Sequence, residues 1–409
     1  MLNKAKRMGK DPLYRNSAYI MATSVVSSAF GFFFWILAAK LYPKEDVGLA
    51  TALISSMSLL ILLTRFGFDA SLIRFLASGD RTKAYSSALT VTTFAAFLAG
   101  AIYVLGIGVF SPQLSFLSDP SYAGLYVLFL CASSTASITS SAFLALREGK
   151  YYLLQSLLMG SRLIFLLPLA AYGLLGLYSS YGIAYMLVAL SLLLLIASKG
   201  IKPGIGADRA FLRKTWKYSA GNYLAGLLSG APALILPLMI LSILGAEQAA
   251  YYYIAYAIAG ILYMIPSAVS TSLFVEGSHG AALKKTVLKS IKTIYAILIP
   301  ATLVLYFGGG VLLSAIGKDY DAGALELMKA FALAGIFMAP ASVYYAIKKI
   351  QKGVKDMTIM TAIQSILLLG LTYVLIQQYG LIGAGWGWVA TYAIMAIIMA
   401  ANAKREGWV

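Results

Sequence analysis

Long stretches without a charged residue constrain this chain more than any other feature. Asp, Glu, Lys and Arg are absent from residues 84–118, 120–146, 218–246, 248–275, 293–317 and 357–403. A transmembrane helix needs about 20 apolar residues, and each of these stretches is longer. The apolar residues run continuously and do not alternate at period two, which excludes a transmembrane β-barrel. The sequence therefore predicts an all-α polytopic membrane protein.

Charges, Gly/Pro clusters and polar loops divide the chain into about twelve transmembrane helices. The predicted spans are 16–41, 47–67, 84–110, 121–146, 151–173, 176–198, 216–244, 248–275, 290–316, 322–347, 357–377 and 380–402. An even number of spans places both termini on the same side of the membrane.

Lys and Arg gather in alternate loops. With a cytoplasmic N-terminus, 27 of the 32 Lys and Arg residues fall in cytoplasmic segments. The opposite side has Lys40, Lys44 and Lys318, while Arg162 and Lys329 lie within predicted helices. This asymmetry follows the positive-inside rule and predicts that both termini are cytoplasmic. It also accounts for the net charge of +17, so we expect no nucleic-acid partner.

Several kinds of chemistry lack the residues they need. Cys131 and His279 are each the single residue of their type, which excludes an intrachain disulfide and a His/Cys metal site. The glycine-rich tract 308–320 lacks the spacing of a phosphate-binding P-loop, so ATP is not expected to drive the protein directly. No catalytic dyad stands out. We therefore predict a protein that is not an enzyme and has no cofactor or metal.

An internal repeat divides the chain into halves. AYGLLGLYSSYGIAY begins at Ala171, and QYGLIGAGWGWVATY begins at Gln378, 207 residues later. DPSYAGL (119–125) and GKDYDAGAL (317–325) form a second pair, and a weaker pair begins at Lys44 and Ala246. Halves of six helices have the same orientation. The repeat thus predicts two six-helix lobes, 1–199 and 200–409, related by a pseudo-two-fold axis along the membrane normal, with substrate between them near mid-membrane.

Four stretches carry a resemblance to a known family. YRNSAYIMATSVVSSAFGFFFWILAAKLYPKEDVGLATALIS and then RFGFDASLIRFLA resemble the start of Wzx-type polysaccharide flippases. LLSAIGKDYDAGALELMKAFALA and YGLIGAGWGWVATYAI resemble that family's later helices, so the resemblance covers most of the chain. These flippases belong to the multidrug/oligosaccharidyl-lipid/polysaccharide exporter superfamily. The resemblance implies two facing six-helix bundles that work by alternating access.

The same resemblance implies a function and its partners. The protein would be a flippase that moves a polyprenyl-diphosphate-linked oligosaccharide from the cytoplasmic to the outer leaflet of a prokaryotic plasma membrane. The membrane potential or an ion gradient, with a coupling cation, would drive it, and we expect a monomer. One alternative is a cation-coupled multidrug antiporter of the same superfamily, and a second is a channel or non-transporting scaffold. The antiporter needs intramembrane carboxylates, whereas the deep helical charge here is an arginine.

Arg162 is the single charge in the predicted span 151–173. Its position, eleven residues into the span, places it about 17 Å deep. An arginine at the middle of the bilayer costs about 2.5–3.5 kcal/mol and normally faces the protein interior or a wet cavity. Two roles are open: binding a substrate diphosphate bidentately, or bonding the Ile164 carbonyl that Pro168 leaves without a donor.

Three further charges lie near the predicted cytoplasmic boundary of the second helix. Arg65 is about 27 Å along that helix from its outer end, and Asp69 follows at pairing distance, with Arg74 beyond it. Arg65 is a candidate substrate ligand, and Asp69 and Arg74 are candidates for a gate or ion pair in an inward-facing state. Charges that merely reach the membrane surface are the alternative.

Each of the remaining polar candidate residues has two interpretations. Glu326 and Lys329, three residues apart near the outer side, either pair with each other or form an outer vestibule in which Lys329 binds substrate. Asn16 and Asn222 open the first helix of each half, where asparagine favours capping, although lining the substrate path is the alternative.

The seventh predicted helix contains GNYLAGLLSGAPALILPLMI (221–240). Gly230, Pro232 and Pro237 make it easy to bend, which predicts a hinge, although close packing through small residues is the alternative. The tyrosines of YYYIAY (251–256) predict an aromatic belt at the membrane interface.

Overall fold

The computed structural model describes residues 12–278, 283–317, 320–351 and 353–408. All regular secondary structure in these residues is helical, and eleven helices are long and apolar enough to cross a membrane. The prediction of an all-α polytopic membrane protein is confirmed. Some of the basic residues used to predict the topology lie outside the described residues: Lys4, Lys6, Arg7, Lys10 and Lys318.

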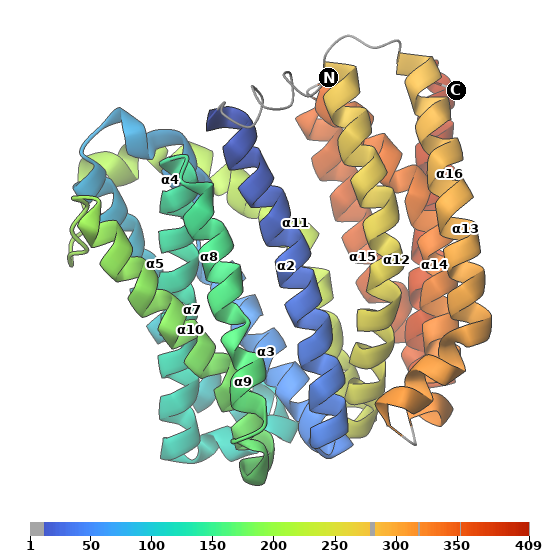
Figure 1. The fold of residues 1–409 in the computed structure, drawn as a ribbon, viewed down its shortest axis with the longest axis horizontal. Helices are drawn as coiled ribbons and strands as arrows, with labels where there is room; N and C mark the ends of the chain where they lie inside the picture. Colours follow the sequence, from blue (N-terminus) through green and yellow to red (C-terminus); the bar gives the residue numbers. More distant parts are fainter. Residues whose placement is uncertain (1–11, 279–282, 318–319, 352, 409) are drawn as a thin grey trace. The chain divides into compact units, whose positions relative to one another are not determined.

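The chain forms two compact units, Met1–Gly230 and Ala231–Val409, coloured blue to green and yellow to red in Figure 1. The first contains α2 (Pro12–Leu41), α3 (Lys44–Thr64), α4 (Phe68–Phe75), η1 (Leu76–Ser78), α5 (Arg81–Leu105), α6 (Ile107–Phe110), η2 (Pro112–Ser118), α7 (Pro120–Ala145), α8 (Gly149–Met159), α9 (Ser161–Leu166), η3 (Ala170–Tyr172) and α10 (Gly173–Ser198). Helix α11 (Arg209–Leu244) passes from the first unit into the second. The second continues with α12 (Ala246–Ser278), α13 (Leu283–Ile316), α14 (Tyr320–Ile350), α15 (Val354–Tyr379) and α16 (Leu381–Arg405).

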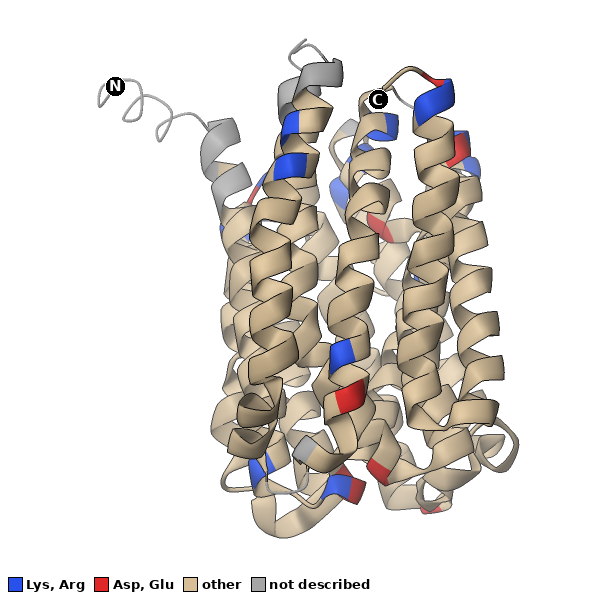
Figure 2. Ribbon diagram, turned by 90° about the vertical axis from the view of Figure 1, so that its right-hand side faces the viewer, with Lys and Arg blue, Asp and Glu red and all other residues tan. Residues whose placement is uncertain are grey.

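Charged residues lie mostly near the ends of the helices, and the middle parts are almost uncharged (Figure 2). This distribution agrees with helices whose central segments lie in hydrocarbon. The lobes 1–199 and 200–409 stay a prediction, because α11 carries residues of both compact units.

The predicted fifth span, 151–173, is present but interrupted. Helix α8 ends at Met159, Gly160 caps it, and the six-residue α9 follows. Pro168 has no N–H to continue α9, and a short 3₁₀ turn leads into α10. The carbonyl of Leu166 at the end of α9 accepts a hydrogen bond from the Tyr42 hydroxyl at 2.7 Å. This broken helix carries Arg162.

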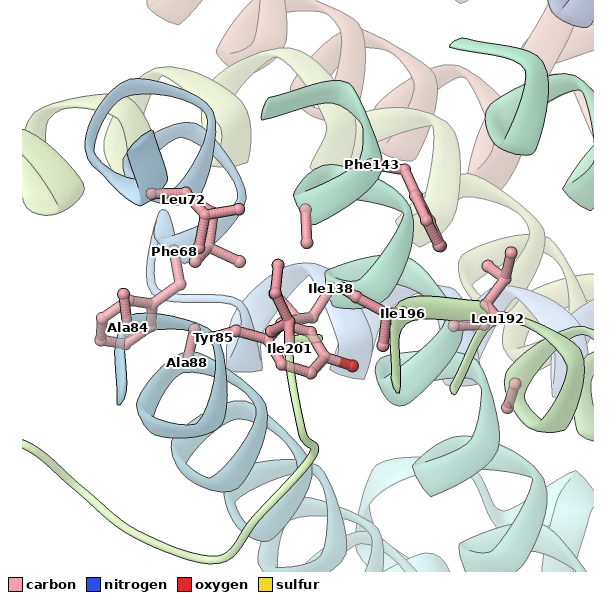
Figure 3. Close-up of a cluster of buried hydrophobic side chains, with 14 of the residues drawn as sticks. Phe68, Leu72, Ala84, Tyr85, Ala88, Ile138, Phe143, Leu192, Ile196 and Ile201 are labelled. Carbon is pink, nitrogen blue, oxygen red and sulfur yellow. The ribbon is translucent and has the colours of Figure 1, made fainter. Parts of the chain in front are cut away.

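A buried apolar cluster holds the first unit together where α4, α5, α7 and α10 meet (Figure 3). Phe68, Leu72, Tyr85, Phe143 and Leu192 contribute its larger side chains. Helix α7 lies centrally, with α5, α10, α4 and α8 packed around it. In the second unit α14 has the same position, with α12, α13 and α16 around it.

The repeat is visible in the backbone of each unit. Gly173 has φ 54° and ψ −135°, and Gly380 has φ 61° and ψ −144°, so each turns the chain into the last helix of its half with the same left-handed geometry. Three residues on, a Cβ at Gly176 would lie 1.8 Å from the Leu169 carbonyl oxygen, and one at Gly383 would lie 2.1 Å from that of Leu375. The matched motif is thus a tight turn in which only glycine fits.

Candidate substrate-binding site

Arg162 is buried inside the first unit, near the break between α8 and α9. Its side chain is 8% exposed, and its guanidinium carbon lies 4.8 Å from the centre of the Phe34 ring and 5.2 Å from that of Tyr181. A Cβ at Gly31 would lie 3.6 Å from one of its terminal nitrogens, so α2 passes close beside it. The arginine therefore lies among α2, α9 and α10.

The charge of Arg162 is not balanced by a carboxylate among the described residues. Its Nε has no hydrogen-bond partner there, and neither has the buried hydroxyl of Ser161 next to it. No described hydrogen bond joins Arg162 to the Ile164 carbonyl, so the structure gives no support to that alternative. Contact with an aromatic ring contributes about 0.5–2 kcal/mol, whereas burying a charge costs several kcal/mol. An anion bound here would remove the imbalance.

Arg65 is the second arginine of this region. It caps the end of α3, its Nε is buried without a hydrogen-bond partner among the described residues, and a terminal nitrogen lies 3.8 Å from a carboxylate oxygen of Asp69. Arg65 and Arg162 both lie within electrostatic range of Tyr185 on α10. The structure thus places around one tyrosine two arginines that are 97 positions apart in the sequence.

The turn after α3 is fixed against the beginning of α11. Phe66 (φ 48°) and Gly67 (φ 74°) are both in the left-handed region, and a Cβ at Gly67 would lie 2.1 Å from the Ser219 carbonyl oxygen. The Ser71 and Ser219 hydroxyls lie 2.6 Å apart, and Tyr223 donates a hydrogen bond of 2.8 Å to the Leu63 carbonyl. These contacts hold Arg65 in place.

Arg74 does not join Arg65. It is exposed at the end of α4, with its guanidinium carbon 4.6 Å from the centre of the Tyr218 ring on α11 and 5.5 Å from that of Phe75. Asp69 pairs with Arg65, as its spacing predicts.

Asn16 and Asn222 both bond to backbone. The Asn16 side-chain oxygen accepts a hydrogen bond of 2.6 Å from the N–H of Gly149, at the start of α8. The Asn222 amide donates a bond of 2.8 Å to the Tyr218 carbonyl within α11. Asn16 therefore satisfies the end of another helix, not of its own.

Lys329 and Glu326 form an ion pair on α14 with a distance of 2.7 Å, and Lys329 lies 5.4 Å from the centre of the Tyr306 ring. Both residues belong to the second unit.

Gly230, Pro232 and Pro237 lie within α11, which is one helix through all three positions. A Cβ at Gly230 would lie 3.2 Å from a methyl of Leu62, so glycine allows close packing here, and the hinge stays a prediction.

Residues 13–274 match the protein family described as Polysaccharide biosynthesis protein, and this match covers more than half of the chain. The chain belongs to this family.

The chain is also similar to a curated protein and to two solved structures. The chain is 24% identical over 166 residues to a Shigella flexneri protein named "Putative O-antigen transporter", and the aligned part spans 39% of this chain and 40% of that relative. A structure of the lipid II flippase MurJ in an inward closed conformation superposes with a TM-score of 0.78 at 15% identity, covering 94% of this chain and 87% of that one. An inward-facing multidrug resistance MATE family transporter of the MOP superfamily superposes with a TM-score of 0.71 at 12% identity, covering 95% and 98%. These structures show the shared fold.

Sequence reasoning missed the aromatic residues of the site. Phe34, Tyr181 and Tyr185 surround the arginine, but none carries a charge that marks it in an apolar span. The spacing of Tyr181 and Tyr185, four apart on one helix, is the signal that could have found them.

Within the described residues, no group of three or more His, Cys, Asp or Glu side chains lies together as a metal site would require.

The interfacial belt predicted for 251–256 is wrong for part of that segment. Tyr251 and Tyr252 are 6% and 2% exposed, and Tyr256 lies against Phe331 and Trp388. The tyrosines face inward because α12 packs on α14, whose small and apolar residues leave room for their rings.

Proposed function

We propose that this protein is a flippase that moves a polyprenyl-diphosphate-linked oligosaccharide from the cytoplasmic to the outer leaflet by alternating access. Its family and the flippase among its structural relatives support this proposal. The observation that carries it is the buried Arg162, whose charge lacks a carboxylate partner among the described residues. A diphosphate is an anion that a planar guanidinium can bind bidentately.

Arg162 would bind the diphosphate directly, and Arg65 would attract it from the cytoplasmic end of the same unit. Both lie within electrostatic range of Tyr185, so an anion near that residue would feel both charges. Asp69 holds Arg65 through a single contact of 3.8 Å, a geometry that leaves Arg65 most of its hydrogen-bonding capacity. The polyprenyl tail would stay in the bilayer throughout.

The driving force follows from the charge of the cargo. A membrane potential that is negative inside favours outward movement of an anion by about 2.3 kcal/mol per charge per 100 mV. A diphosphate therefore moves outward without a coupled cation, although coupling to an ion gradient would add to the driving force. With the basic loops on the inside, both termini are cytoplasmic and the protein lies in a prokaryotic plasma membrane.

The remaining candidate residues have supporting parts in this proposal. Gly230, Pro232 and Pro237 would form the hinge of α11 during the change of state between lobes 1–199 and 200–409. Lys329, held by Glu326, would contact the headgroup on the outer side, and Arg74 with Tyr218 would close the inner side. Asn16 and Asn222 would act mainly through the backbone groups that they bond.

A cation-coupled multidrug antiporter is the competing function, because MATE transporters share the fold. The charges gathered at Tyr185 are arginines, which repel a cationic drug. The positive charge of these two arginines therefore favours an anionic cargo over a cationic one.

Reconstituted proteoliposomes test the proposal directly. A fluorescent polyprenyl-diphosphate sugar is placed in both leaflets, and a membrane-impermeant quencher reports how fast the inner pool becomes accessible. We expect rapid exchange with the protein and slow exchange in empty liposomes. Equal rates in both would refute the flippase, and transport of an organic cation in the same vesicles would favour the antiporter.

A further inference from the structure

The second unit contains a chain of hydrogen bonds between side chains of three of its helices. Thr361 donates to the Tyr345 hydroxyl at 3.3 Å, Tyr345 donates to the Gln364 side-chain oxygen at 3.3 Å, and the Gln364 amide donates to the Tyr392 hydroxyl at 3.2 Å. The four residues come from α14, α15 and α16. Three helices of one unit therefore meet at the amide of Gln364.

These bonds are long and leave capacity unused. Hydroxyl bonds usually measure about 2.7–2.8 Å and amide bonds about 2.9–3.0 Å. An amide has two N–H donors and a tyrosine hydroxyl has one. The described bonds use one N–H of Gln364 and leave it a second, and they leave the proton of the Tyr392 hydroxyl without an acceptor. Gln364, Tyr345 and Thr361 are each partly exposed, so a ligand could replace or complete these bonds.

The surroundings of this chain are uncharged. The residues that interact electrostatically with Tyr392 include Tyr252, Tyr256, Tyr263 and Tyr345, all of which are uncharged at neutral pH. The nearest basic residue along α14, Lys348, is occupied by carboxylates of Asp356 and Glu406 at 2.7 and 2.6 Å. The chain is thus suited to neutral hydroxyl and amide groups, not to a phosphate.

Aromatic rings adjoin the polar chain. Tyr392 lies 5.8 Å, ring centre to ring centre, from Trp388, and Trp388 lies 5.3 Å from Tyr256 and 5.9 Å from Tyr263. Tyr256 and Tyr263 are partly exposed. Ligand sites typically combine such apolar rings with a few placed polar groups, and a pyranose presents both C–H and O–H groups.

We propose that Tyr345, Thr361, Gln364 and Tyr392 form a subsite for an uncharged sugar unit of the transported lipid. This inference rests on the proposed flippase function and assigns its substrate class, a diphosphate followed by a neutral sugar. Gln364 is ten residues along α15, about 15 Å from its start and about 10 Å from Met357, where the uncharged part of the helix begins. The subsite would therefore lie inside the hydrocarbon core, toward the end of α15 that carries Lys355 and Asp356.

Two lipids with the same anionic head test the subsite: polyprenyl diphosphate, and polyprenyl diphosphate carrying one N-acetylhexosamine. Wild-type protein should move the sugar-bearing lipid faster. Gln364→Leu should slow the sugar-bearing lipid about tenfold and leave the sugar-free lipid unchanged, since one or two hydrogen bonds to an uncharged ligand are lost. Gln378→Leu, on an exposed position of the same helix, should change neither rate.

Tyr392→Phe separates binding from folding, because it removes one hydroxyl and keeps the ring. It should reproduce the selective loss in smaller degree. Equal slowing of both lipids by Gln364→Leu and Tyr392→Phe, or equal wild-type rates for the two lipids, would overturn the sugar subsite while the flippase stands. Failure of the wild type to move either lipid would overturn the proposed function itself.

Discussion

Replacing Arg162 with leucine should strongly reduce anion transport without weakening the protein. The guanidinium is 8% exposed, contacts two rings and has no carboxylate partner among the described residues, so its removal eliminates a buried charge that costs several kcal/mol. The lost contacts with Phe34 and Tyr181, at about 0.5–2 kcal/mol each, offset part of this cost. The Tm of the protein without ligand should therefore stay the same or rise.

Transport should fall by about 100-fold in the same Arg162→Leu variant. Two charge-assisted hydrogen bonds to a diphosphate, at about 1.5 kcal/mol each, sum to about 3 kcal/mol, and each 1.4 kcal/mol is a factor of ten. Arg162→Lys keeps the charge but loses the fork of donors, so its rate should lie between those of the two proteins.

Thermal unfolding in detergent supplies the second measurement. Polyprenyl diphosphate at 100 times its Kd should stabilise wild type by about 2.7 kcal/mol and Arg162→Leu much less. Unchanged transport by Arg162→Leu would remove the arginine from the site. A lower Tm of the unliganded variant, with transport lost in proportion, would show that Arg162 is structural.

Two further predictions concern the frame around the site. Gly67→Ala should lower the Tm strongly, because φ is 74° and the new methyl would lie 2.1 Å from the Ser219 carbonyl oxygen. Gly79→Ala is the control and should change the Tm little, because no atom lies within 4 Å of its Cβ position. Equal Tm values for the two variants would contradict the packing described. The hydrogen bond from Lys199 holds the pKa of Glu148 below its ordinary value, so this carboxylate contributes stability that is present at neutral pH and is lost as pH falls through its lowered pKa. Glu148→Gln should accordingly lower the Tm at pH 7, and the difference should shrink progressively as the pH is lowered into the acid range; a pH-independent difference would argue against the pairing.

The positions of charged residues and the long apolar stretches between them were sufficient to predict most of the fold. The helices begin and end near charges, Pro or Gly, so predicted span 121–146 is α7 from Pro120 to Ala145, and span 380–402 is α16. The break at Gly160 was not predictable, because a single glycine in an apolar span also occurs within continuous helices. At Gly160 the Phe30 ring of α2 lies 2.7 Å from where a Cβ would be, and the end of α9 is fixed by Pro168 and by the Tyr42 hydroxyl on the Leu166 carbonyl.

The site was predictable only where a charge marked it. Arg162 stands out because lipid makes its burial costly, whereas its aromatic neighbours resemble any other apolar residue. Asn16 illustrates the opposite difficulty. Its position at a helix start predicted that it caps its own helix, but it caps α8 instead. A local sequence pattern cannot indicate a hydrogen-bond partner 133 residues away.

The repeat explains why two such different sites lie in one chain. The offset of 207 residues between the glycine turns relates Tyr181 to Trp388 and Tyr185 to Tyr392. In the first unit the tyrosine lies within electrostatic range of two arginines, and in the second it accepts a hydrogen bond from a neutral amide. A duplicated frame thus keeps an aromatic residue at each position while the charge beside it differs. Because a buried arginine selects anions and an uncharged amide does not, the candidate site in the first unit is suited to a diphosphate, and the hydrogen-bonded chain in the second unit is suited to an uncharged group.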